Sequence, residues 1–174
     1  MSTTDDVGSK TQIPAGVWQV DPGASELGFG ARAMFGLVPV KGTFGEFDGT
    51  LTVGEDGAAH GELHIQAATL DTRNAKRDTH LRSADFFDVE NHPVVTFELT
   101  GLRAGPTVDG VLRIRENALP ITAPATISAG AADGVKITTE LDVDRAAAGV
   151  GWSKLGMIKG KAHLRAAIAL SRQS

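Results

Sequence analysis

Cysteine is absent from the 174-residue chain, which excludes disulfides, thiolate catalysis and cysteine metal sites. Clusters of lysine or arginine are also missing. With a net charge of -4, the sequence has no basic stripe that would follow nucleic-acid phosphates. No stretch reaches the roughly 20 apolar residues of a membrane helix. The first ten residues are polar and acidic where a secretory signal needs basic residues and an apolar run, so we expect a cytoplasmic protein.

The length fits one domain. Residues 1–14 are expected to form a flexible tail and residues 15–174 the folded domain. The sequence shows no internal repeat.

Short runs that alternate apolar and polar residues dominate the domain. Strict alternation places one set of side chains on each face of a strand. The strands are expected at residues 17–21, 25–34, 40–53, 60–69, 94–102, 108–115, 119–128, 135–144 and 162–171. Short turns between them favour antiparallel neighbours and a closed barrel. Within 40–53, three glycines indicate a bend or bulge, and Pro120 and Pro124 place their strand near an edge or bulge.

The apolar face of these strands carries many small residues. They are Ala31, Ala33, Ala67, Ala123, Ala125 and Ala166. An eight-stranded barrel can be filled by side chains or can hold one small ligand. Small inward residues favour the second case, and therefore a binding protein rather than a catalyst.

One segment lacks the alternation. Good helix formers and a cap residue predict a short helix at about residues 74–82. Phe86 and Phe87 follow it outside any strand, where they would serve as a plug or lid at one end of a barrel.

Catalytic and metal-binding patterns are weak. Residues 151–156 approach the serine hydrolase elbow, but the second glycine comes one residue late. His60, Glu62 and His64 share a strand face, which alternation makes the solvated outer one. Asp78 is expected to dock the helix through an ion pair or hydrogen bonds, and His80 to reach a ligand head group at the mouth of a pocket.

Several motifs resemble the YceI-like family over about residues 16–172. They are Trp18-x-Val20-Asp21-Pro22-x-x-Ser25-x-Leu27-x-Phe29, Leu70-Asp71-Thr72, Arg77-Asp78-x-His80-Leu81-Arg82-Ser83-x-Asp85-Phe86-Phe87-Asp88, Pro93-x-x-x-Phe97, and Asp144-Arg145 before Gly149-Val150. The resemblance implies an all-β, antiparallel, eight-stranded lipocalin-like barrel with a short helix near one end. It also implies non-catalytic binding or transport of a long isoprenoid lipid or isoprenoid quinone, bound as a ligand with no further cofactor.

The residues expected to bind this ligand combine the inner faces of the strands with the mouth. They are Leu27, Phe29, Phe44, Leu63, Ile65, Arg77, His80, Phe86, Phe87, Val95, Phe97 and Leu164. The sequence leaves open a transient membrane contact during loading and a homodimer.

Two alternatives remain open. The barrel could be a filled scaffold in a stress-response or protein-interaction module that meets its partner through residues 150–158, which include Trp152 and Leu155. An enzyme with His80 as base is the other, although the chain offers no nucleophile or cofactor motif to accompany that histidine.

Overall fold

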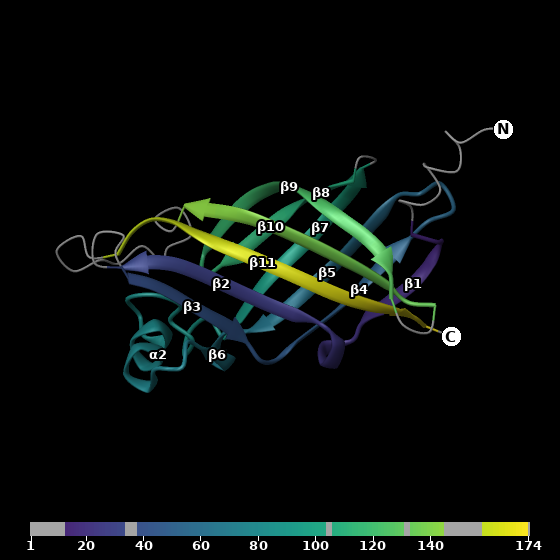
Figure 1. Cartoon of the computed structure of the whole chain (residues 1–174). Helices are drawn as coiled ribbons and strands as arrows, with labels where there is room; N and C mark the ends of the chain where they lie inside the picture. The colour runs from purple at the N-terminus through teal and green to yellow at the C-terminus, as the bar shows by residue number, and fades with distance from the viewer. Residues whose placement is uncertain (1–12, 34–37, 104–105, 131–132, 145–157, 174) are drawn as a thin grey trace.

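The computed structural model describes residues 13–33, 38–103, 106–130, 133–144 and 158–173 (Figure 1). The strands are β1 (Gly16–Val20), β2 (Glu26–Ala33), β3 (Val38–Phe44), β4 (Phe47–Val53), β5 (Ala59–Gln66), β6 (Leu70–Asp71), β7 (Val94–Arg103), β8 (Thr107–Ile114), β9 (Asn117–Ala129), β10 (Val135–Asp144) and β11 (Ile158–Arg172). The helical elements are the 3-10 turns η1 (Pro22–Ala24) and η2 (Ala67–Thr69) and the α-helix α2 (Ala75–Arg82).

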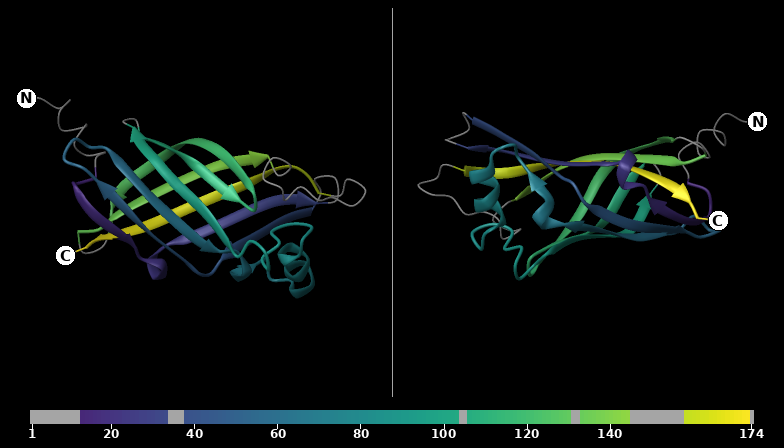
Figure 2. Two further views of the ribbon diagram at one scale, coloured as in Figure 1. Left: turned by 180° about the vertical axis from the view of Figure 1, so that it is seen from behind. Right: turned by 90° about the horizontal axis from the view of Figure 1, so that it is seen from below.

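The strands form one antiparallel sheet that closes on itself. β1 pairs with both β4 and β11, which joins the two ends of the sheet. β1 and β2 follow one another along the same edge of β11, and β3 and β4 pair with β2 and β1 in turn. β1 and β2 therefore make one interrupted strand of the barrel, and β3 and β4 make another. With β6 as a two-residue addition, the wall is an eight-stranded barrel with a short helix at one end (Figures 1 and 2), and the predicted fold class is confirmed.

The expected strand at 40–53 is two elements rather than one. Gly45 lies between β3 and β4, and its backbone N–H donates to the carbonyl of Thr69 at 3.2 Å. The hydroxyl of Thr69 also accepts from the N–H of Gly45 and of Glu46, both at 3.1 Å. The glycines do mark a bend, as predicted. The bend interrupts the strand because its backbone donors turn to the η2 segment instead of a neighbouring strand.

The segment between β5 and β7 carries α2. The side chain of Asn74 caps the helix by accepting from the N–H of Arg77 at 3.0 Å, which satisfies one of the free donors of the first turn. The helix therefore begins where the sequence predicts. It lies beside β6 and β3 at one end of the barrel (Figure 1).

Trp18 closes the opposite end. Its side chain is 1% exposed, and its indole N–H donates to the carbonyl of Pro14 at 3.0 Å. Ile13, Val53 and Ala59 are buried in the same core. Ile13 thus packs in the core and Pro14 contacts Trp18, while the division into a tail and a domain stays a prediction. None of the helices in the described ranges is long and apolar enough to cross a membrane.

Candidate functional site

The barrel encloses an apolar cavity of about 240 Å³. It is formed by the side chains that alternation directs inward, and almost all of them are hydrocarbon. Those from the second half of the chain include Leu99, Leu102, Val108, Leu112, Ile114, Ile121, Ala123, Ile137, Leu141, Val143, Ala162, Ala166, Ile168 and Leu170. Such a wall excludes water and offers dispersion contacts, with few partners for a polar ligand.

Most of the side chains that the sequence placed in the ligand site lie on this cavity wall. They are Leu27, Phe29, Phe44, Leu63, Ile65, Phe87, Val95, Phe97 and Leu164. They come from β2, β3, β5, β7 and β11 and from the segment after α2. That they bind a ligand stays a prediction.

Three rings gather on the wall near the α2 end. The ring centroids of Phe29 and Phe44 are 5.1 Å apart, and those of Phe44 and Phe87 are 5.8 Å apart with an edge-on angle of 88°. These separations suit favourable aromatic contacts. The rings connect strand residues to the segment after α2, so Phe87 has the place expected of a lid residue.

Phe86, by contrast, is absent from the cavity wall. It is 4% exposed and packs edge-on against the ring of His80, with centroids 5.1 Å apart. The imidazole Nε2 of His80 lies 2.9 Å from a carboxylate oxygen of Asp85. His80 therefore contacts its own segment, and the expected head-group contact stays a prediction.

Arg77 and Asp78 hold the helix against β6. Arg77 Nε donates to the hydroxyl of Thr72 and Nη2 to its carbonyl, both at 2.8 Å. One carboxylate oxygen of the buried Asp78 accepts from both the N–H and the hydroxyl of Thr72. The docking role predicted for Asp78 is what the structure shows. Arg77 shares that role and does not line the cavity.

The small residues expected on the inner face fall into three pairs. Ala123 and Ala166 line the cavity as expected. Ala67 is fully buried, but in η2 rather than on a strand, and Ala125 is outside the lining. The side chains of Ala31 and Ala33 lie outside the described part of the chain. Alternation could also have identified Leu141, Val143 and Ile168, since all three are inward positions of predicted strands.

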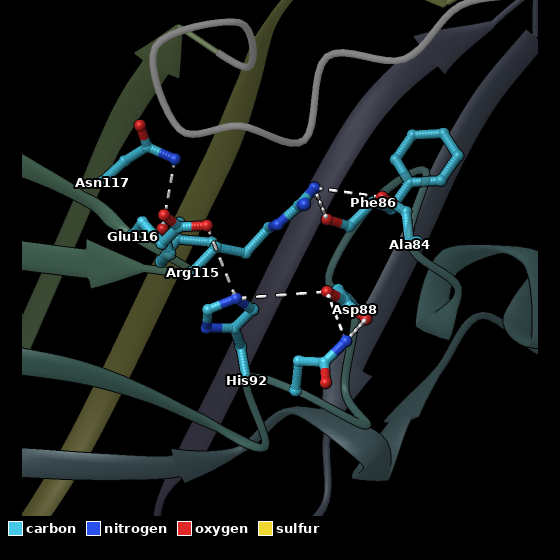
Figure 3. A network of polar contacts seen from close by, with 9 residues as sticks. Ala84, Phe86, Asp88, His92, Arg115, Glu116 and Asn117 are labelled. Carbon is cyan, nitrogen blue, oxygen red and sulfur yellow. Dashed lines mark hydrogen bonds and ion pairs between the residues drawn. The ribbon is translucent and has the colours of Figure 1, made fainter.

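A polar network ties the segment after α2 to the turn between β8 and β9 (Figure 3). Arg115 Nη1 donates to the carbonyls of Ala84 and Phe86 at 3.1 and 3.0 Å. His92 Nε2 lies 4.0 Å from Asp88 and 3.9 Å from Glu116. The network holds the segment that carries Phe87 over the end of the barrel.

Outside the barrel, His64 Nε2 lies 2.9 Å from Glu62, and His64 Nδ1 lies 3.6 Å from Asp48. These side chains are largely exposed on the outer face, where alternation places them. Across the described ranges, no three His, Cys, Asp or Glu side chains meet in a way that could hold a metal. Residues 150–157 of the alternative interaction loop lie outside the described residues.

Comparison with known proteins adds relatives of similar sequence. The chain is 37% identical over 91 residues to a UPF0312 protein of Pseudomonas aeruginosa. This match covers 51% of this chain and 47% of the relative. It is 37% identical over 91 residues to Protein YceI of Escherichia coli O157:H7, with 49% and 48% covered. The matched region spans about half the length of these curated relatives.

Solved structures share the fold at low identity. Burkholderia cenocepacia BcnA superposes with a TM-score of 0.77 at 22% identity, covering 86% of this chain and 98% of BcnA. A polyisoprenoid binding domain from Saccharophagus degradans gives a TM-score of 0.72 at 15% identity, covering 90% and 98%. The model of the YceI-like domain matches residues 18–170. The chain therefore belongs to the YceI-like family.

Proposed function

We propose that this protein binds a long apolar lipid of the isoprenoid type, or an isoprenoid quinone, inside its barrel and carries or sequesters it without chemical change. The apolar cavity carries the proposal: its wall is built of hydrocarbon side chains from both halves of the chain. A wall of this kind favours a ligand that needs few hydrogen bonds.

The energetics suit a hydrocarbon chain. Burial stabilises such a chain by about 0.8 kcal/mol per methylene group. Several buried isoprene units would therefore hold the ligand with no polar contact along its length. The Saccharophagus degradans domain, described as polyisoprenoid binding, has the same fold and supports this ligand class.

The same wall supports a non-catalytic role. The side chains around the cavity offer carbon surface, and the polar groups of α2 and of the following segment bond to neighbouring parts of the protein. Loading from a membrane and pairing of two copies stay predictions.

The test uses two adjacent alanines of β11. Ala166 lines the cavity, whereas the side chain of Ala167 points to the opposite face. Ala166→Phe should fill part of the cavity and weaken binding of all-trans-retinol, an intrinsically fluorescent isoprenoid alcohol, at least about tenfold. Ala167→Phe adds the same ring outside and should leave the Kd within about twofold.

Fluorescence titration measures both Kd values, and thermal unfolding confirms that each variant folds. Mass spectrometry of the intact protein purified from its own host should also reveal a lipid-sized adduct that organic extraction removes. Equal retinol binding by the two variants, or none by the unaltered protein, would count against an interior site.

A further inference from the structure

The barrel wall is interrupted between β9 and β10. The pairing of these strands runs from Ala129 opposite Val135 to Ala125 opposite Thr139 and ends there. Beyond that point, residues 117–124 of β9 pair with β8, and residues 140–144 of β10 pair with β11. Within the described residues, these two stretches have no strand partner on their facing sides. We call this interruption the seam.

Two prolines account for the seam. The N–H of Ala125 points to β8, where it donates to the carbonyl of Pro106 at 3.0 Å. Since successive residues of a strand direct their backbone groups to opposite neighbours, the residues facing β10 are Pro120, Thr122 and Pro124. Proline has no N–H to donate. A continued ladder would therefore lack two of its donors from β9.

The last link across the two strands lies where the seam begins. The hydroxyl of Thr139 donates to the carbonyl of Pro124 at 2.7 Å. We call the two strand edges that border the seam, residues 117–124 of β9 and 140–144 of β10, its lips. Past this bond, outward polar side chains of each lip contact the strand with which that lip is paired, and not the other lip. Thr122 donates to Asp109 on β8 at 2.9 Å, whereas Glu140 and Asp142 contact His163 on β11. Each lip is thus attached to its own half of the wall.

The inner edges of the seam are apolar. Ile121 and Ala123 on β9 and Leu141 and Val143 on β10 all line the cavity. A hydrocarbon chain leaving the cavity would therefore meet these carbon side chains first, before it passes the backbone groups of the two strands. The polar groups of the lips would not have to break bonds with one another.

The two ends of the barrel are held more firmly. Trp18 and its neighbours are buried at one end. At the other, the contacts among Phe29, Phe44 and Phe87 and the bonds from Arg115 hold the segment after α2 in place. Passage of a ligand at that end would break these contacts, whereas at the seam the described residues of β9 and β10 have no ladder hydrogen bonds to each other.

We propose that the apolar ligand enters and leaves the barrel sideways, through the seam between β9 and β10. This inference rests on the proposed function, because it describes how the ligand of that site is exchanged. Closing the seam should slow entry and exit equally. The affinity should remain the same, since a barrier on the route does not change the free energies of the free and bound states.

The experiment exploits the absence of cysteine from the chain. Thr122→Cys with Asp142→Cys places two thiols where the interrupted ladder would bring residues opposite one another, and bismaleimides of increasing length join them across the seam. The matched control is Thr126→Cys with Thr138→Cys, a pair on the same two strands within the intact ladder. Intact mass identifies fully cross-linked protein.

Stopped-flow fluorescence then follows all-trans-retinol uptake and its release to phosphatidylcholine vesicles. The seam cross-link should slow both rates at least about tenfold with the Kd within about twofold, as expected for a gated site. The control cross-link should leave both rates within about twofold. Pro120→Val with Pro124→Val provides a second, uncross-linked way to close the seam, because it restores two backbone donors, and it should slow exchange as well.

Unchanged rates in the seam cross-link and in the proline variant would overturn the lateral route while leaving interior binding intact. Slowing by the control cross-link as strongly as by the seam cross-link would overturn it too. Absence of retinol binding by the unaltered protein would instead refute the proposed function, and this inference with it.

Discussion

The ring of Phe97 lies directly against the backbone of Gly110 on the neighbouring strand. A Cβ atom added at Gly110 would meet Phe97 Cζ at 2.5 Å and would come closer still to the carbonyl oxygen of Glu98. The absent side chain lets Phe97 fold over the β8 wall and still line the cavity.

Gly110→Ala should therefore destabilise the protein by about 2 to 3 kcal/mol, because the added methyl group collides with backbone as well as with a ring. Urea unfolding measures the loss. Gly101→Ala is the matched control on β7, since a Cβ atom added there would meet nothing closer than a carboxylate oxygen of Asp109, at 3.9 Å. It should change stability by no more than about 1 kcal/mol, and a similar loss in both variants would contradict the explanation.

Adjacent phenylalanines should behave differently. Phe87 lines the cavity, whereas Phe86 is buried against His80. Phe87→Ala should weaken retinol binding about tenfold by removing part of the wall. Phe86→Ala should mainly cost stability, about 3 to 5 kcal/mol, because it leaves a hole in the core.

Fluorescence titration and urea unfolding of both variants separate the two effects. The assignment would be wrong if the folded molecules of Phe86→Ala bound retinol more weakly than those of Phe87→Ala.

The buried carboxylate of Asp78 gives a sharper comparison. Because the two bonds from Thr72 converge on one oxygen, Asp78→Asn retains an acceptor, whereas Asp78→Ala leaves two donors unsatisfied. We expect Asp78→Ala to cost about 2 to 4 kcal/mol, given about 1 to 3 kcal/mol for each buried group left without a partner. Asp78→Asn should cost clearly less. Amide hydrogen exchange at α2 checks that the loss is local, and equal losses in the two variants would contradict it.

His163 should titrate at a raised pH. Its Nδ1 lies 3.0 Å from Asp142 and its Nε2 2.7 Å from Glu140. The hydrogen bonds to Asp142 and then to Glu140 raise the pKa of the imidazole above its usual value of 6.5. A raised pKa means that the protonated ring stabilises the fold. This contribution is fully present below about pH 6.5 and is lost as the pH rises through the folded-state pKa.

NMR titration of the ring resonances measures this pKa. Asp142→Asn should lower it, and Glu62→Gln, which alters a contact of His64 on another strand, should leave it unchanged. An unaltered His163 titration in Asp142→Asn would show that the carboxylate is not responsible.

Alternation predicted the elements that follow a strict two-residue period. The bounds of β10 match the sequence prediction, and inward positions such as Leu63, Phe97 and Leu164 do line the cavity. The break at Gly45 could not be located in the same way, because it depends on bonds to Thr69, which is distant in the sequence.

The segment after α2 was harder to interpret. Phe86 and Phe87 are adjacent, and no strand period exists there to show which ring faces the cavity. Arg77 and His80 have partners in Thr72 and Asp85, and side-chain pairing of this kind is fixed by tertiary packing. The prolines of β9 did predict an edge, and its partner-free stretch is where they lie.

Trp18 gives the barrel a floor. Trp18 is buried and absent from the cavity lining, whereas Val20, two residues further along β1, belongs to it. A tail of increasing length would therefore reach a stop at that depth, and any further carbon would have to remain outside. The barrel would then limit the length of ligand that it can bury: affinity should rise with each added isoprene unit until the tail reaches Trp18, and then remain constant.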